Sequence, residues 1–216
     1  MSDVFREVDE EVRKDQALSL WNRYGRFLIG GVVGVVAATA AWQGWTAWSL
    51  SQRQADAETF LGGLSLKTQE RLGDAEAAFA QLAADGGAGY QALARLQQAA
   101  VMVAVGDGAA GVAVYDALAE DGGLDQTLRD LASLLAAQSL LDTADSQTLA
   151  RRLEPLLAES NPWRFSAREL IGLAAIRHGD LGVARSSFTQ LADDPATPQG
   201  IRARAAELLA AIGDGA

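Results

Sequence analysis

His178 is the only histidine of this 216-residue chain, and the chain contains no cysteine. The missing thiols exclude disulfides, thiol catalysis and cysteine-ligated metal centres. His178 directly precedes Gly179-Asp180, at the expected C-terminal end of a helix, where an imidazolium interacts favourably with the helix dipole. We therefore interpret His178 as a structural cap and not as a catalytic base.

The paired acids Glu120-Asp121 and Asp193-Asp194 are the remaining candidates for acid–base chemistry. Both pairs lie at expected helix ends or loops, where carboxylates are usually solvated, and neither has the spacing of a calcium-binding loop. The chain also lacks the G-x-S-x-G nucleophile motif and the glycine-rich phosphate-binding motifs. The sequence therefore predicts a protein that is not an enzyme and has no cofactor, metal or small-molecule substrate.

Charge and composition bear on the type of partner and on the fold class. A net charge of -10 and a pI of about 4.6 argue against nucleic acid as a partner, because its phosphates require a positive surface. Alanine and leucine supply 72 residues, whereas the β-branched valine and isoleucine supply only 18. This excess of helix formers predicts an all-α fold.

The most apolar segment covers residues 27–48, inside a run from Phe27 to Gln52 that carries no charge. Its 22 residues make a helix of about 33 Å at about 1.5 Å per residue, which matches a hydrocarbon core of about 30 Å. Aromatic residues flank the span as they do at membrane interfaces. They are Trp21, Tyr24 and Phe27 before it, and Trp42, Trp45 and Trp48 after it. We predict a single N-terminal transmembrane helix.

The cations around this span predict its orientation. Arg13, Lys14, Arg23 and Arg26 precede the span, and Arg53 is the only cation after it before residue 67. The positive-inside rule then makes 1–26 a cytoplasmic leader and sends 49–216 across the membrane. A bacterial inner membrane with a periplasmic C-terminal domain is the natural setting.

Three alternatives concern this N-terminal region. Ala38-Thr39-Ala40 fits a signal-peptide cleavage site, but the leader carries six acids and the apolar run continues to Trp48, so we favour an uncleaved anchor. The pair Gly30 and Gly34 has the spacing that lets two membrane helices approach closely, and a homodimer through this helix is therefore one alternative. Val4, Val8 and Val12 form one stripe of a leader helix, either a docking helix or an extension of the span.

The exported part contains a repeat. Large residues at 79, 115, 153 and 188 are 35 to 38 positions apart, and each is followed three residues later by leucine. Turn signals precede three of them by nine positions, at Gly106-Asp107, Ala144-Asp145 and Gly179-Asp180, while Gly73-Asp74 lies only six before Phe79. A period near 34–38 with two helices per unit indicates a tetratricopeptide-like α-solenoid of about four degenerate helix pairs.

The last unit carries this pattern best, with Ile171-Gly172, Gly179, Ala184 and Phe188 at tetratricopeptide spacing. Gly172 is expected to let two helices touch, and Phe188 to fill the gap to the next unit. We predict helices at about 17–68, 73–84, 88–105, 108–120, 124–142, 146–153, 162–178, 181–193 and 197–212. Pro155 should end a helix near Leu153, Asn161-Pro162 should cap and start the next, and Trp163 should pack between repeats.

Binding then depends on shape. The first helix of each tetratricopeptide pair lines the concave face, and the consensus inner positions fall mainly on aliphatic residues without a Lys/Arg clamp. The candidate partner-binding residues are Leu96, Val103, Leu134, Leu141, Leu173 and Ile176. Either these residues form an open apolar groove for an amphipathic or unfolded segment, or tight curvature buries them. The degenerate repeats favour partial burial.

Three stretches stand out beside the repeats: the opening residues 5–15, the span at 27–48 and the late stretch 161–170, which begins Asn161-Pro162-Trp163. With them, essentially the whole chain resembles the YfgM-type inner-membrane tetratricopeptide-like proteins, ancillary subunits of the Sec translocon. The resemblance implies a periplasmic protein–protein adaptor that contacts translocon subunits, periplasmic chaperones or newly exported clients. The alternative is a structural scaffold of another envelope complex, such as division or outer-membrane assembly machinery; an envelope hydrolase with unrecognised carboxylates is a third hypothesis.

Overall fold

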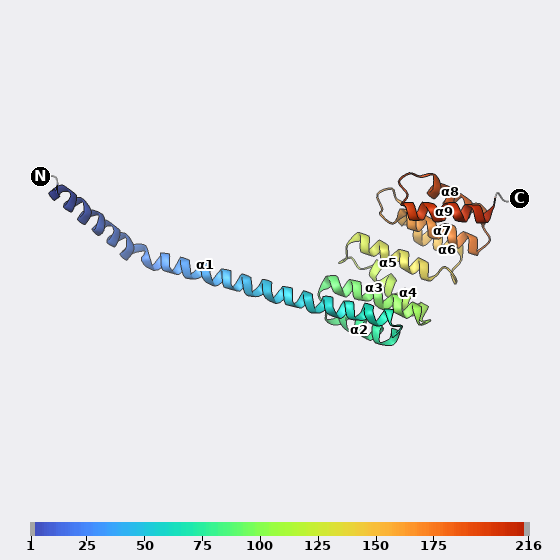
Figure 1. Cartoon of the computed structure of the whole chain (residues 1–216), viewed down its shortest axis with the longest axis horizontal. Coiled ribbons are helices and arrows are strands. Elements are labelled where there is room, and N and C mark those ends of the chain that lie inside the picture. Colours follow the sequence, from blue (N-terminus) through green and yellow to red (C-terminus); the bar gives the residue numbers. More distant parts are fainter. Residues whose placement is uncertain (1–2, 214–216) are drawn as a thin grey trace. The chain divides into compact units, whose positions relative to one another are not determined.

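The computed structural model describes the backbone of residues 3–213 and the side chains of residues 21, 23–27 and 29–213. All regular elements of this part of the chain are helical, which confirms the all-α prediction (Figure 1). They are α1 (Asp3–Thr68), α2 (Leu72–Asp85), α3 (Ala88–Ala104), α4 (Gly108–Ala119), α5 (Gln126–Ser139), α6 (Ser146–Leu153), the 3-10 helix η1 (Glu154–Leu157), α7 (Arg164–Arg177), α8 (Leu181–Asp193) and α9 (Gln199–Ile212).

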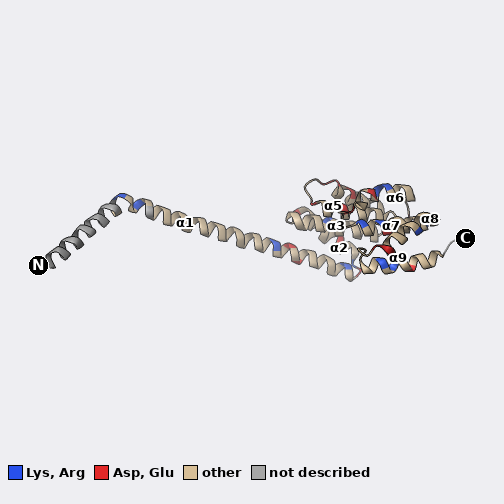
Figure 2. Ribbon diagram, turned by 90° about the horizontal axis from the view of Figure 1, so that it is seen from above, with Lys and Arg blue, Asp and Glu red and all other residues tan. Residues whose placement is uncertain are grey.

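The chain divides into two units, Met1–Gln54 and Ala55–Ala216. In the first unit α1 begins at Asp3, not near residue 17 as predicted, because the leader continues the helix of the span. The predicted valine stripe of the leader lies outside the described side chains. Between Arg26 and Arg53 the helix carries no charge (Figure 2).

One helix among the described residues, Arg23–Thr68 of α1, is long and apolar enough to cross a membrane. None of its most apolar 18-residue window is buried by the rest of the chain. A core helix of a soluble domain would be covered by neighbours, so this exposure is compatible with a single-pass membrane protein.

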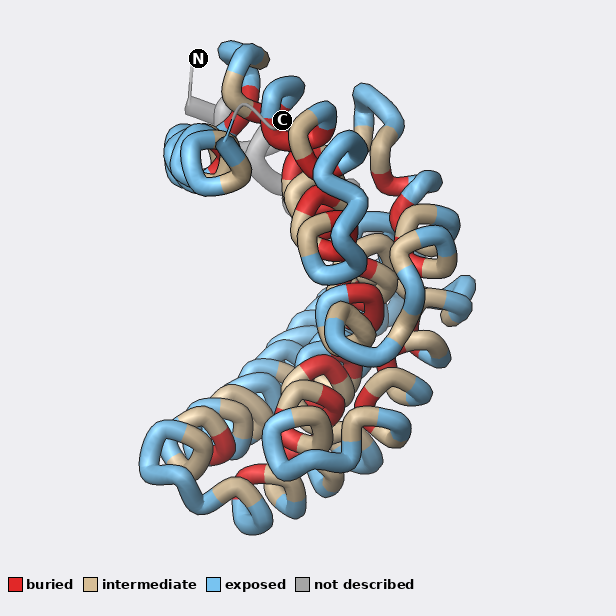
Figure 3. The backbone as a smooth tube through the Cα atoms, turned by 90° about the vertical axis from the view of Figure 1, so that its right-hand side faces the viewer, coloured by how far each residue is buried: buried red, intermediate tan, exposed pale blue. Residues whose placement is uncertain are grey.

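The second unit is a stack of helix pairs. The C-terminal part of α1 (residues 55–68), α3, α5 and α7 are the first helices, α2, α4, α6 and α8 are the second helices, and α9 follows the last pair. From α2 onward, each helix packs against the next, and α7 also contacts α5 and α9. Buried residues lie on the faces that these helices turn toward one another (Figure 3). The four pairs confirm the predicted tetratricopeptide-like solenoid.

The period found in the sequence corresponds to the core. The four large residues Phe79, Tyr115, Leu153 and Phe188 are between 0% and 2% exposed. The leucines three positions later, at 82, 118, 156 and 191, are also buried. Each pair of buried residues lies one helical turn apart on a second helix or just beyond it, so one face of that helix fills the space between neighbours.

Glycines on the first helices receive these aromatic rings. A Cβ atom added to Gly172 would lie 2.6 Å from Cζ of Phe188, and one added to Gly63 would lie 2.6 Å from Cε1 of Phe79. Any side chain at either glycine would therefore overlap a ring that is fully buried. The expected helix contact at Gly172 is confirmed, and Gly63 repeats it in the first pair.

The turns inside the pairs also repeat. Gly106 and Gly179 adopt positive φ angles of 96° and 77° and end α3 and α7 in a Schellman-type cap, in which Asp107 N–H bonds Met102 O and Asp180 N–H bonds Ala175 O. In the first pair the same place, nine residues before Phe79, is taken by Glu70 with φ 60°. The predicted turn at Gly73-Asp74 was wrong, because α2 already begins at Leu72. A glutamate in a left-handed position gave no turn signal.

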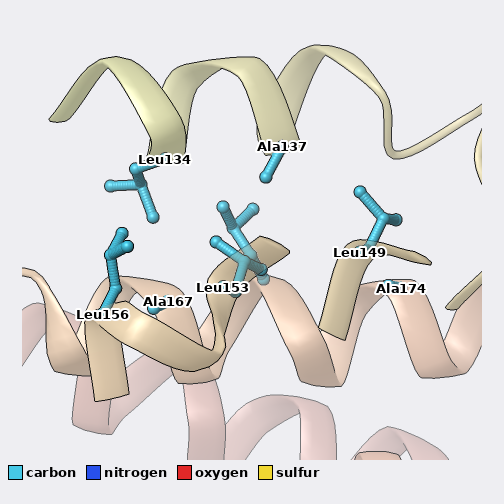
Figure 4. Close-up of a cluster of buried hydrophobic side chains, with 8 residues drawn as sticks. Leu134, Ala137, Leu149, Leu153, Leu156, Ala167 and Ala174 are labelled. Carbon is cyan, nitrogen blue, oxygen red and sulfur yellow. The ribbon is translucent and has the colours of Figure 1, made fainter. Parts of the chain in front are cut away.

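The end of α6 and the start of α7 can be compared with the predicted helix ends. Helix α6 ends at Leu153 and a 3-10 turn containing Pro155 follows, as predicted. Helix α7 starts at Arg164, two residues later than predicted, because Asn161 Oδ1 accepts the N–H of Trp163 at 2.9 Å and forms a turn before the helix. Side chains from α5, α6, η1 and α7 then meet in one cluster (Figure 4).

Candidate protein-interaction surface

The sixteen inner positions of the first helices are the candidate interaction surface, and most are half-buried. Leu93 and Gln138 are exposed, whereas Leu96 and Leu134 are each only 7% exposed. The remaining positions are intermediate. The set comprises Ala57, Phe60, Leu64, Lys67, Leu93, Leu96, Ala100, Val103, Leu131, Leu134, Gln138, Leu141, Ser166, Glu169, Leu173 and Ile176.

The six residues predicted to bind a partner belong to the cores between helix pairs. Leu96 and Val103 pack with Tyr115 and Leu118, and Leu134 and Leu141 pack with the cluster of α5, α6 and α7. Leu173 packs against that cluster and the next one, where Ile176 also lies. The face therefore shows the partial burial that degenerate repeats favour, and its accessible area comes from half-buried side chains and from the exposed Leu93 and Gln138.

Polar side-chain contacts join elements of neighbouring helix pairs. Lys67 Nζ donates to Gln97 Oε1 at 3.1 Å. Arg204 Nε donates to Glu169 Oε1 at 2.7 Å, and this carboxylate raises the pKa of the Arg204 guanidinium. Arg152 pairs with Asp116 and Arg177 with Asp142 one repeat away. These four basic side chains therefore bind partners inside the solenoid.

Trp163 lies between repeats, as predicted. Its ring packs against the cluster of α5, α6 and α7, and its Nε1 donates to the Thr127 carbonyl at 3.0 Å. Asn161 Nδ2 donates to Asp130 Oδ2 at 2.8 Å. The residues before α7 therefore attach this helix to the start of α5. The indole of Trp163 has a structural role in this packing.

His178 and one acid of each pair, Asp121 and Asp194, have structural partners. His178 is the C-cap of α7, and its Nε2 donates to the carbonyl of Ala144, 2.9 Å away in the preceding pair. Asp121 pairs with Arg95 at 3.6 Å and accepts the Gly123 N–H. Asp194 accepts the Ala196 N–H at 2.8 Å. Among the described residues no group of three or more histidines or carboxylates is placed to hold a metal ion.

The aromatic residues predicted to flank the membrane are all exposed side chains of α1. Trp21 and Tyr24 precede the span, and Trp42, Trp45 and Trp48 lie at its C-terminal end with exposures of 59% to 71%. The rings of Trp45 and Trp48 lie 5.4 Å apart. Cβ atoms added to Gly30 or Gly34 would meet nothing within 4 Å, so this side of the helix is open.

Sequence reasoning missed two hollows at the turns between first and second helices. One, of about 600 Å³, is lined by Gly106, Ala109 and Val112 from the start of α4 and by Leu140 and Thr143 after α5. The other, of about 190 Å³, is lined at equivalent places by α6, α7 and α8. Their signal in the sequence is the small residues that follow each turn.

Helix pairs stacked on a repeated core, with a half-buried apolar face on their first helices, define a helical-repeat interaction domain. The chain belongs to the tetratricopeptide repeat-like domain family, whose profile matches residues 19–208. Such domains are typically non-enzymatic and bind other proteins. No curated protein and no solved structure matches the chain significantly.

Proposed function

We propose that the protein is a membrane-anchored adaptor of the bacterial inner membrane, with a cytoplasmic leader at 1–26, a transmembrane helix at 27–48 and a periplasmic solenoid at 49–216. The observation that carries the proposal is the family match over residues 19–208 together with an apolar 18-residue window of α1, none of which is buried among the described residues. The flanking cations support the orientation.

The proposed partners are Sec translocon subunits, periplasmic chaperones and the exported chains that they handle. This assignment is supported by the resemblance to YfgM-type proteins, and the interaction role by the family. The net charge of -10 favours protein partners over nucleic acid, because phosphates require a positive surface. A homodimer through Gly30 and Gly34 is a further part of the proposal.

Site-specific photo-crosslinking in membranes tests the partners. A photo-reactive residue at Leu93, which is 39% exposed, or at the half-buried Leu173 should capture translocon or chaperone subunits. The same residue at the exposed Ala117 of α4, a second helix away from the inner positions, is the control and should capture nothing. Exclusive capture of division or outer-membrane assembly proteins would replace the proposed partners by the scaffold alternative.

Topology has a separate test. The chain has no cysteine, so a single introduced cysteine gives labelling without background. In intact spheroplasts a membrane-impermeant maleimide should label Glu159→Cys in the solenoid and not Ser2→Cys in the leader. The reverse pattern would refute the proposed orientation, and loss of the first 40 residues from the mature chain would show a cleaved signal peptide.

A further inference from the structure

Three of the five large apolar side chains exposed in the solenoid lie at one edge. Val105, directly after α3, is 51% exposed, and Leu181 and Val183 at the start of α8 are 44% and 43% exposed. Each follows the end of a first helix. We name the turns 105–108, 140–146 and 177–183 the turn edge; Leu141 is the one inner position that it includes.

The two hollows repeat along this edge. Ala109 and Val112 of the larger hollow correspond to Gln147 and Ala150 of the smaller one, since all lie six and three residues before Tyr115 and Leu153. Val183 lines the smaller hollow and contributes its exposed side chain. The edge therefore presents two apolar sites in the same place of successive repeats.

Carboxylates surround these hollows. Asp107, Asp145 and Asp180 cap α4, α6 and α8 by accepting backbone N–H groups, and none has a cation within ion-pair distance among the described side chains. Asp142 is paired with Arg177. The turn edge carries these four aspartates against one cation, Arg177, and the amino ends of α4, α6 and α8 offset the carbonyl ends of α3, α5 and α7 at the same turns. The surface around the hollows is therefore negative.

We propose that the turn edge docks a basic amphipathic helix of a partner protein. Its apolar side chains would enter the two hollows, and its lysines or arginines would meet Asp107, Asp145 and Asp180. A helix fits because it satisfies its own backbone hydrogen bonds, whereas the edge offers a partner strand no ladder of free backbone groups. This inference rests on the proposed adaptor function and identifies the class of ligand and the site.

The spacing of the hollows sets the pattern of the ligand. One is lined by the end of α5 and the other by Ile171 and Ala175 of α7. These two helices pack side by side, and the axes of packed helices are about 8–10 Å apart. Seven residues of helix rise about 10.5 Å. The docked helix should therefore carry apolar anchors seven residues apart, with cations flanking them.

The test uses the full chain in zwitterionic lipid nanodiscs, with empty discs as background. The probe is a fluorescent 18-residue helix of leucine and lysine with leucines seven residues apart; a second peptide has glutamate for lysine. The variant Asp107→Asn/Asp145→Asn/Asp180→Asn removes three charges and keeps the caps, because asparagine is as good an N-cap. The control Glu58→Gln/Glu159→Gln/Asp193→Asn removes three exposed charges elsewhere in the solenoid.

We expect the lysine peptide to bind and the glutamate peptide not to bind. The triple asparagine variant should weaken binding about tenfold at low salt, from three surface ion pairs of the usual strength, and the control variant less than twofold. No binding of the lysine peptide, equal binding of both peptides, or an equal effect of the two variants would overturn the inference. Partner capture at Leu93 or Leu173 would still stand in that case, so the adaptor function would survive the loss of this site.

Discussion

The neighbouring glycines Gly62 and Gly63 of α1 should respond in opposite directions to the same substitution. Gly63 is buried against Phe79, whereas a Cβ atom added to Gly62 would meet nothing within 4 Å. Alanine is favoured over glycine inside a helix by about 0.5–1 kcal/mol. Gly62→Ala should therefore stabilise the solenoid by about that amount.

Gly63→Ala gains the same helix preference but creates an overlap. The new methyl group would lie 2.6 Å from Cε1 of Phe79, where carbon atoms normally keep about 3.5–4.0 Å, and the ring is 0% exposed and cannot swing into solvent. Overpacking of this kind costs about 1–3 kcal/mol. The net expectation is a loss of about 0.5–2 kcal/mol.

Urea unfolding of the full chain in detergent micelles, followed by circular dichroism, measures both changes. Phe79→Leu in the Gly63→Ala background should recover about 1 kcal/mol relative to the sum of the single changes, because it removes the overlapping ring atoms. An unfolding midpoint for Gly63→Ala at or above that of Gly62→Ala would refute the packing argument. Gly172→Ala, facing Phe188, repeats the experiment in the last pair.

Three further predictions concern turns and caps. Glu70→Gly should raise stability by about 0.5–1 kcal/mol, because it relieves a left-handed residue at φ 60°; a lower urea midpoint would contradict this. Asn161→Ala should cost about 1–3 kcal/mol by removing its bonds to Trp163 N–H and Asp130, measured as the same midpoint; an unchanged midpoint would mean that α7 is not locked there. Hydrogen bonds from Thr148 lower the pKa of Asp145, so its cap is fully stabilising above pH 3.8 and is lost as the pH falls through the lowered folded-state value. Asp145→Asn should therefore lose less stability than the natural chain between pH 6 and 2.5, and parallel pH profiles would reject this account.

Much of the fold could be predicted from the sequence, because local rules and tertiary packing agree. Alanine and leucine at helical spacing, with turn residues between them, placed the helices within a few residues of their observed ends, apart from the start of α1. The spacing of residues 79, 115, 153 and 188 found the buried core directly, since a repeat buries the same position in each unit. The apolar span could also be predicted from the sequence, because its length and its flanking aromatic residues are properties of the chain alone.

Other features depend on contacts that no spacing encodes. Glu70 takes a place that glycine holds in two other pairs, because the surrounding cap determines its backbone conformation. Whether Leu96 and Leu134 face a partner or a core depends on how closely successive pairs pack, and only the structure shows them 7% exposed. The turn edge likewise joins residues from three separate turns. The helices, their repeat and the apolar span can be predicted from the sequence, because they follow from local periodicity. The tertiary structure decided which apolar residues are left for partners, because exposure depends on neighbours distant in the chain.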